Sequence, residues 1–136
     1  MRDIYLGVKT TKREVELFLD ELHDVLNNED FDIDRDFIMI IKKKPDDEQH
    51  STTYTLADLD YDTYDVIERL KELNVSEYSQ TLLDKDDNNP PLLYVFGKTI
   101  NDKQVYIKLK IKGESRQRVL CISFHYARDV MTFPFA

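Results

Sequence analysis

The sequence contains little cysteine, glycine or proline, and it has no long apolar run. Its single cysteine, Cys121, excludes an internal disulfide and any metal site built from several thiolates. Three glycines and four prolines argue against a collagen-like or low-complexity chain. No stretch approaches the roughly 18 apolar residues that a membrane-spanning helix needs, and the N-terminal residues lack the apolar run of a signal peptide. We therefore expect a soluble, cytoplasmic protein.

What is present is an ordinary globular composition with an uneven distribution of charge. Hydrophobic residues make up 41% and charged residues 34% of the 136 residues, which favours one domain, residues 1–136, with a single core. The net charge of -8 argues against a protein that mainly binds phosphate backbones. However, residues 1–97 carry 11 basic and 24 acidic side chains, whereas residues 98–128 carry 8 basic and 2 acidic ones. The basic segment indicates either a polar partner or ion pairs with the acidic remainder of the same fold.

Three segments in the first part of the chain have helical patterns. Residues 11–27 begin with a capping box and continue with apolar residues at helical spacing. A similar but shorter pattern predicts one helical turn at residues 55–58. A longer helix is expected over residues 62–73, where Asp62 would cap the first turn. Its inward-facing residues are predicted to be Val66, Ile67, Leu70 and Leu73.

Strand patterns occur at residues 37–41 and in the C-terminal third. The apolar run 37–41 is rich in β-branched residues and predicts a strand buried on both faces, which ends at the lysines and proline of residues 42–45. Residues 92–98, 104–112 and 118–125 predict an antiparallel meander. The order of elements predicts an α+β domain, in which N-terminal helices pack on a mainly antiparallel sheet that ends in this three-stranded meander.

Alternation predicts which face each side chain of the last two strands occupies. In residues 104–112, the side chains expected to face the core are Val105, Ile107, Leu109 and Ile111. In residues 118–125, the inward set is Leu120, Ile122 and Phe124. The outward set of that strand is Val119, Cys121, Ser123 and His125.

The polar face of the predicted meander is the best candidate for a functional site. Its members would be Tyr106, Lys108, Lys110, Ser123 and His125. A histidine beside a tyrosine and several cations can transfer protons and stabilise phosphate charge, and RNA cleavage by its own 2′-hydroxyl requires only those elements. The alternative is a solvated sheet face with strand-favoured tyrosine and solubilising lysines.

Two acidic runs and the cysteine give weaker indications. Residues 32–36 and 84–88 have the alternate oxygen ligands of a calcium loop, but Phe37 and Asn89 occupy the required glycine positions. We therefore expect solvated loops there, with neither a metal nor a cofactor. Cys121 shares a predicted strand face with His125, yet the sequence shows no third group that would orient a catalytic thiol.

Three C-terminal segments carry a resemblance to a known family. They are YVFGK at residues 94–98, QVYIKLK at residues 104–110 and VLCISFH at residues 119–125. Together they resemble the MqsR family of toxins, which are ribosome-independent mRNA interferases of type II toxin–antitoxin systems. The resemblance implies a RelE-like fold, metal-independent endoribonuclease activity, an RNA substrate and a cognate antitoxin protein as partner.

The resemblance also implies roles for individual residues. Tyr106 falls on the family's active-site tyrosine, and His125 stands where the family has a catalytic lysine. Two other family positions fall near Gln80 and near Val95 or Phe96, which do not match the family's lysine and glutamine. The hypothesis is proton transfer by Tyr106 and His125, with phosphate contacts from basic residues. The predicted RNA-binding residues are Lys98, Lys108, Lys110 and Arg118.

Two further functions stay open at this point. A non-catalytic module could use the same sheet face to bind a protein or RNA. A structural or self-associating protein could instead use the apolar C-terminal segment VMTFPF, residues 130–135, which needs to be covered. The sequence does not predict an oligomeric state.

Overall fold

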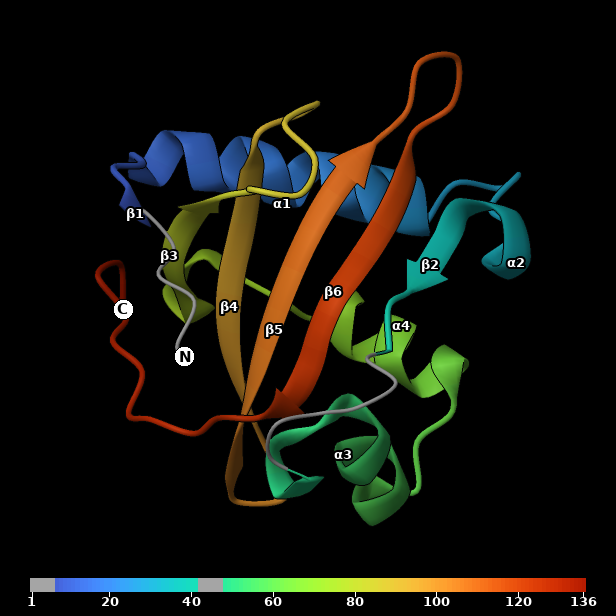
Figure 1. The fold of residues 1–136 in the computed structure, drawn as a ribbon. Coiled ribbons are helices and arrows are strands. Elements are labelled where there is room, and N and C mark those ends of the chain that lie inside the picture. The colour runs from blue at the N-terminus through green and yellow to red at the C-terminus, as the bar shows by residue number, and fades with distance from the viewer. Residues whose placement is uncertain (1–6, 42–47) are drawn as a thin grey trace.

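The computed structural model describes residues 7–41 and 48–136, which form one sheet and several helices (Figure 1). The elements of the first half are β1 (Gly7–Val8), α1 (Lys12–Leu26), α2 (Ile33–Asp36), β2 (Phe37–Met39), the 3₁₀ turn η1 (Glu48–His50), α3 (Thr52–Leu59) and α4 (Thr63–Lys71). The elements of the second half are η2 (Val75–Glu77), β3 (Tyr78–Leu83), β4 (Leu92–Ile100), β5 (Lys103–Lys112) and β6 (Arg118–Tyr126). Within the described ranges, no helix is both long enough and apolar enough to span a membrane.

The six strands have the order β1-β3-β4-β5-β6-β2. All neighbours pair antiparallel except β2 and β6, which run parallel at one edge. Figure 1 shows α1 and α4 across one face of the sheet, with α3 at the end where β6 finishes. The structure therefore confirms the α+β prediction, including the meander β4-β5-β6.

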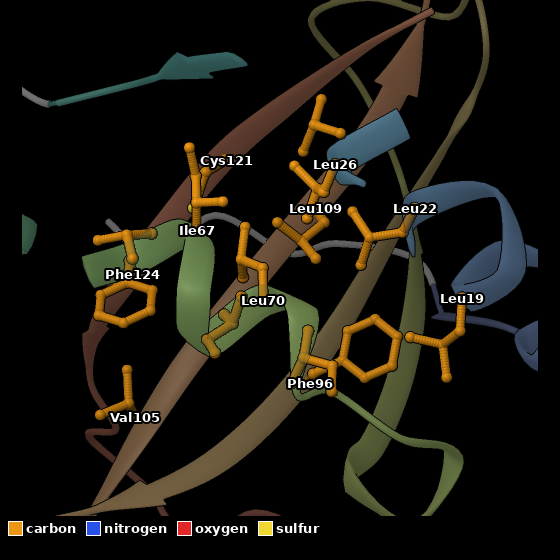
Figure 2. Packing of buried hydrophobic residues seen from close by; sticks show 14 of the residues in the cluster. Leu19, Leu22, Leu26, Ile67, Leu70, Phe96, Val105, Leu109, Cys121 and Phe124 are labelled. Atoms are coloured by element: carbon orange, nitrogen blue, oxygen red, sulfur yellow. The ribbon is translucent and has the colours of Figure 1, made fainter. Parts of the chain in front are cut away.

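The helix-covered side of the sheet, called the inner face below, holds the main core. Val105, Ile107 and Leu109 of β5 are fully buried, as the alternation predicts. Figure 2 shows Leu22 and Leu70, from α1 and α4, packed against this layer. Burying one such side chain stabilises the fold by about 1.5–3 kcal/mol relative to exposure. The apolar faces of the helices thus position the sheet, and with it the opposite face.

The helix starts follow local side-chain chemistry. Thr11 and Glu14 form the predicted capping box of α1, and Asp62 caps α4 through the backbone N–H of Asp65. The prediction of a turn beginning at Thr55 is wrong, because Ser51 caps the helix and α3 starts at Thr52. Thr55 instead accepts a hydrogen bond from the backbone N–H of Tyr126 at 2.9 Å, which ties α3 to the end of β6.

The strand predicted at residues 37–41 is shorter and less buried than expected. Among the described residues, β2 pairs with β6 alone, with Phe37 opposite Val119. Phe37 is buried, but Ile40 and Ile41 are 40% and 50% exposed. The prediction of a strand buried on both faces is wrong, since an apolar run does not reveal whether a strand is central or at an edge. The predicted break at residues 42–45 lies outside the described residues.

A β-bulge in β6 decides which of its side chains face the core. Lys108 pairs with Ser123 and Leu109 with Cys121, so one extra residue, Ile122, lies between the two pairs. The fully buried side chains on the inner face are Val119, Cys121 and Phe124. The predicted inward positions of Leu120 and Ile122 and outward positions of Val119 and Cys121 are therefore wrong. Phe124 faces inward, and Ser123 and His125 share the outer face with Lys108, as predicted.

The C-terminal tail, residues 127–136, packs on its own sheet. It leaves β6 and crosses toward the β3 side of the sheet (Figure 1). A Cβ atom at Gly97 would lie 2.8 Å from Met131 Sδ and 2.8 Å from the Phe133 ring, so any side chain at this position would displace these two residues of the tail. The Phe135 ring stacks on Tyr78 with a centroid distance of 5.4 Å. The tail's aromatic side chains are thus partly buried against the same chain.

Candidate functional site

Tyr106 and His125 lie directly opposite each other on β5 and β6. Both side chains are on the outer face, the side of the sheet away from α1 and α4 that carries Tyr106, Lys108, Lys110, Ser123 and His125. Their rings stack with centroids 5.1 Å apart and planes 12° from parallel. The structure therefore brings together the two residues to which the sequence assigns proton transfer.

The surroundings of His125 favour the neutral imidazole. Burial is the main reason that its pKa lies below the ordinary 6.5, and the positive charges of Arg128, Lys108 and His50 lower the pKa further. A hydrogen bond to the backbone carbonyl of Tyr126 acts in the opposite direction. Nδ1 makes this bond at 2.9 Å, and as the partner is an acceptor, Nδ1 carries the proton. Nε2 is then the ring atom that can accept a proton at neutral pH.

Lys108 adds positive charge beside the stacked rings. Its Nζ lies 5.9 Å from the centre of the Tyr106 ring, and the residue is 8% exposed. Register places Lys108 opposite Ser123, two pairs further along the strands from Tyr106 and His125 and on the same face. A cation, a phenol and a neutral imidazole therefore occupy adjacent positions on one face.

Two of the predicted RNA-binding lysines are engaged elsewhere. Lys110 is 1% exposed, and its Nζ lies 2.8 Å from the Asp84 carboxylate and 2.8 Å from the Asp87 backbone carbonyl. Lys98 pairs with Glu77 at 3.2 Å and lies opposite the buried Val105, on the inner side of the sheet. Both lysines hold the chain's own acidic segments in place.

Arg118 lies at the far end of β6 from His125. It pairs in register with Lys112, seven positions along the strand from His125. At about 3.3 Å per residue this separation is roughly 20 Å. The structure thus groups Tyr106, Lys108 and His125, and it does not bring Lys98, Lys110 or Arg118 to them.

Most basic side chains of residues 98–128 form ion pairs with acidic side chains of the first part of the chain. Within residues 7–41 and 48–136, five of the eight basic residues in segment 98–128 contact carboxylates from the first 97 residues. These five are Lys98, Lys103, Lys110, Lys112 and Arg116. The basic sheet and the acidic first half are therefore in large part complementary surfaces of one fold.

Carboxylates of the two acidic runs form ion pairs with basic side chains of the same chain. Asp36 is buried, and its carboxylate accepts from Arg116 Nε at 2.7 Å and from Arg35 Nε at 3.1 Å, which holds the Asp36 pKa far below its usual range. The hydrogen bond from Lys112 is the main reason that the pKa of Asp87 lies at about 2. No group of three or more histidine, cysteine or acidic side chains suited to a metal ion occurs in residues 7–41 and 48–136.

Cys121 is not placed for nucleophilic chemistry. Its side chain is fully buried on the inner face, on the opposite side of the sheet from His125. Burial raises the pKa of the thiol to about 12, so the reactive thiolate is scarce at neutral pH. The position follows from the bulge at Ile122.

The sequence gives no sign of an open groove of about 480 Å³ beside the end of β6. Three parts of the chain form its walls: residues 49, 50 and 54 of η1 and α3, residues 103–104 at the start of β5, and residues 126–130 at the end of β6 and the start of the tail. The basic side chains that line it are His50, Lys103 and Arg128. Because these segments are far apart in sequence, no local motif could have indicated the groove.

Comparisons with protein-family models, with curated proteins and with solved structures give no match for this chain.

Proposed function

We propose that this protein is a toxin-like, metal-independent endoribonuclease with a RelE-like fold. The observation that supports this proposal best is the stacked pair of Tyr106 and His125, in which Nε2 of a neutral imidazole is the proton-accepting atom. Lys108 supplies a neighbouring positive charge. The resemblance of three segments to the MqsR toxins supports the same activity and adds a cognate antitoxin as partner.

The chemistry follows from the roles that these groups can take. Nε2 of His125 accepts the proton of an RNA 2′-hydroxyl, and the 2′-oxygen attacks the adjacent phosphorus. The bond from phosphorus to the 5′-oxygen breaks, and the Tyr106 hydroxyl donates a proton to that leaving oxygen. Lys108 stabilises the charge that develops on the phosphate oxygens. The products are a 2′,3′-cyclic phosphate and a 5′-hydroxyl, after which proton exchange with water restores both side chains.

Cleavage of a mixed-sequence RNA by the purified protein tests this proposal. We expect His125→Gln and Tyr106→Phe each to lower the cleavage rate by about 10²–10⁴-fold, the usual contribution of a general acid or base. Tyr64→Phe is the matched control, because Tyr64 lies on α4 and is 64% exposed. Analysis of the RNA ends should show cyclic phosphates.

The proposal fails if the wild-type protein does not cut RNA, or if both variants cut as fast as the wild type. RNA binding without cleavage would instead support a non-catalytic binding module on the same fold. The ion pairs of Lys98 and Lys110 leave fewer cations for phosphate than the sequence predicts, which favours a protein over RNA as the ligand of such a module. Self-association through the tail has less support, since the tail's aromatic rings contact Gly97 and Tyr78 of the same chain.

A further inference from the structure

The groove beside β6 has the volume and the chemistry of a small-ligand site. Its volume of about 480 Å³ lies within the range typical of sites for small organic ligands. Its walls combine the aromatic rings of Tyr54 and Tyr126 with the side-chain amides of Gln49 and Gln104. An aromatic surface next to amides is the combination that proteins use for an unstacked nucleobase, which they stack on a ring and bind through its edge.

Tyr54 is the ring available for stacking. It is 37% exposed, whereas Tyr126 is only 7% exposed. The two rings meet edge to face at 6.4 Å, and Lys103 Nζ lies 4.7 Å from the centre of the Tyr126 ring. The Tyr126 hydroxyl also donates to Asp58. These contacts hold Tyr126 as a fixed part of the wall and support Tyr54 above it.

The charges in the groove suit a base at one side and a phosphate at the other. Lys103 pairs with Asp58 at 3.5 Å, so that side carries little net charge. Arg128 and His50 line the groove together with the acidic Asp129, and the positive charges of Arg128 and His50 act electrostatically on His125. A nucleotide whose base occupies the neutral side would therefore place its phosphate toward the positive side, next to the proposed catalytic pair.

We infer that this groove binds one nucleobase of single-stranded RNA, adjacent to the phosphate that is cleaved, and thereby sets the base preference of the enzyme. The inference rests on the proposed endoribonuclease function and names a specificity site for it. Tyr54 stacks on the base, and Gln104 contacts its edge. Neither residue belongs to the proposed proton-transfer pair.

Titration of ¹⁵N-labelled protein with AMP, GMP, CMP and UMP tests base binding without any need for catalysis. We expect chemical-shift changes in residues 49–54 and 126–130, with one nucleotide bound more tightly than the other three. Tyr54→Ala should weaken that binding by roughly 5- to 150-fold, the range found for loss of one stacking ring. Gln104→Ala should reduce the difference between bases, and Tyr64→Ala serves as the exposed-tyrosine control. Shifts confined to other segments, equal binding of all four nucleotides, or unchanged binding by Tyr54→Ala would overturn the inference.

Mapping of RNA cleavage sites separates this inference from the proposed function. If the inference is correct, Tyr54→Ala still cuts RNA through His125 but with a relaxed base preference. Cleavage by Tyr54→Ala with an unaltered preference contradicts the base site and leaves the enzyme proposal standing. Selective nucleotide binding in the groove of a wild-type protein that never cuts RNA contradicts the enzyme proposal and leaves the base site standing. Urea unfolding of each variant identifies any loss that results from misfolding.

Discussion

The two ends of the outer face use the same residue types in different ways. Lys108 and Lys110 are two positions apart on β5, share one face and are 8% and 1% exposed. At the Lys110 end, loop 84–91 supplies Asp84 and Asp87, and the lysine becomes part of a buried ion pair. At the Lys108 end, Lys108 lies beside the Tyr106 ring, which stacks on His125. A lysine on a sheet face therefore acquires its role from the loop that covers it.

The ion pair of Lys110 with Asp84 adds little net stability to the fold. Desolvation of two charges offsets most of their attraction, so a buried pair contributes little net free energy. Removing one partner is costly, because the other charge remains buried without compensation. Four predictions, beginning with the largest effect, test this contrast between the two ends.

The thiol of Cys121 reports on the bulge that divides the two ends. Its pKa of about 12, compared with an ordinary 9.0, reduces the thiolate by roughly 1000-fold at pH 8. We therefore expect Ellman's reagent to label the native protein at least about 1000-fold more slowly than the urea-unfolded protein. Fast labelling of the native protein would place Cys121 on the outer face with His125 and contradict the bulge.

Lys110→Met should destabilise the protein by about 3 kcal/mol in urea unfolding at pH 7, because Asp84 loses its buried partner. Lys71→Met is the matched control, because its ion pair with Glu68 is partly exposed and its loss should change the free energy of unfolding by less than about 1 kcal/mol. The pKa of Asp84 is lowered in the fold, so its pairing stabilises the protein at neutral pH and is lost as the carboxyl protonates in acid. The difference between Lys110→Met and wild type should accordingly shrink at low pH. Equal costs for Lys110→Met and Lys71→Met would show that the buried pair is no more sensitive to loss of its lysine than an exposed one.

Gly97→Val tests the contact between the tail and the sheet beside Tyr106. The new side chain would displace Met131 and Phe133, and we expect a loss of about 1 kcal/mol together with faster carboxypeptidase digestion of the tail. Gly7→Ala is the control, because nothing lies within 4 Å of a Cβ atom at that position. Digestion at the wild-type rate would show that the packing of the tail on the sheet does not depend on Gly97.

His125 should give the smallest effect, a change in the pH dependence of stability. Because its pKa in the fold lies below 6.5, the unfolded chain binds more protons as the pH falls through this range. Stability contributed by neutral His125 is thus complete above pH 6.5 and declines below it. His125→Gln should show a shallower decline between pH 7 and pH 5 in urea unfolding. Identical slopes would mean that burial does not perturb the histidine.

Local chemistry made much of the fold predictable. The capping residues Thr11 and Asp62 mark the starts of two helices, and period-two alternation assigns every core residue of β5 correctly. Strand β3 was not predicted, because its sequence YSQTLL has no regular alternation. The faces of residues 119–122 were predicted incorrectly, since a single extra residue reverses the alternation and leaves no trace in composition.

The candidate site was only partly predictable, for a related reason. Tyr106 and His125 could be assigned to the same face from alternation and strand order alone. Their pair lies beyond the bulge, in a stretch where the alternation of both strands is regular. Lys98 and Lys110 pair with Glu77 and Asp84, respectively, and each partner lies more than twenty residues away in the chain. Ion pairs of this kind follow no sequence spacing, so the sequence could not show that, of the four predicted RNA-binding residues, Lys108 is the one that lies beside the Tyr106 ring.

By itself the sequence determined the α+β class, the main helices, the meander and the outward direction of Tyr106 and His125, because these follow from capping and periodicity within short segments. Only the tertiary structure decided which charges are paired, where the bulge lies and that segments 49–54, 103–104 and 126–130 enclose a groove. Those features arise from contacts between distant segments, and their positions are set by how the helices pack on the sheet.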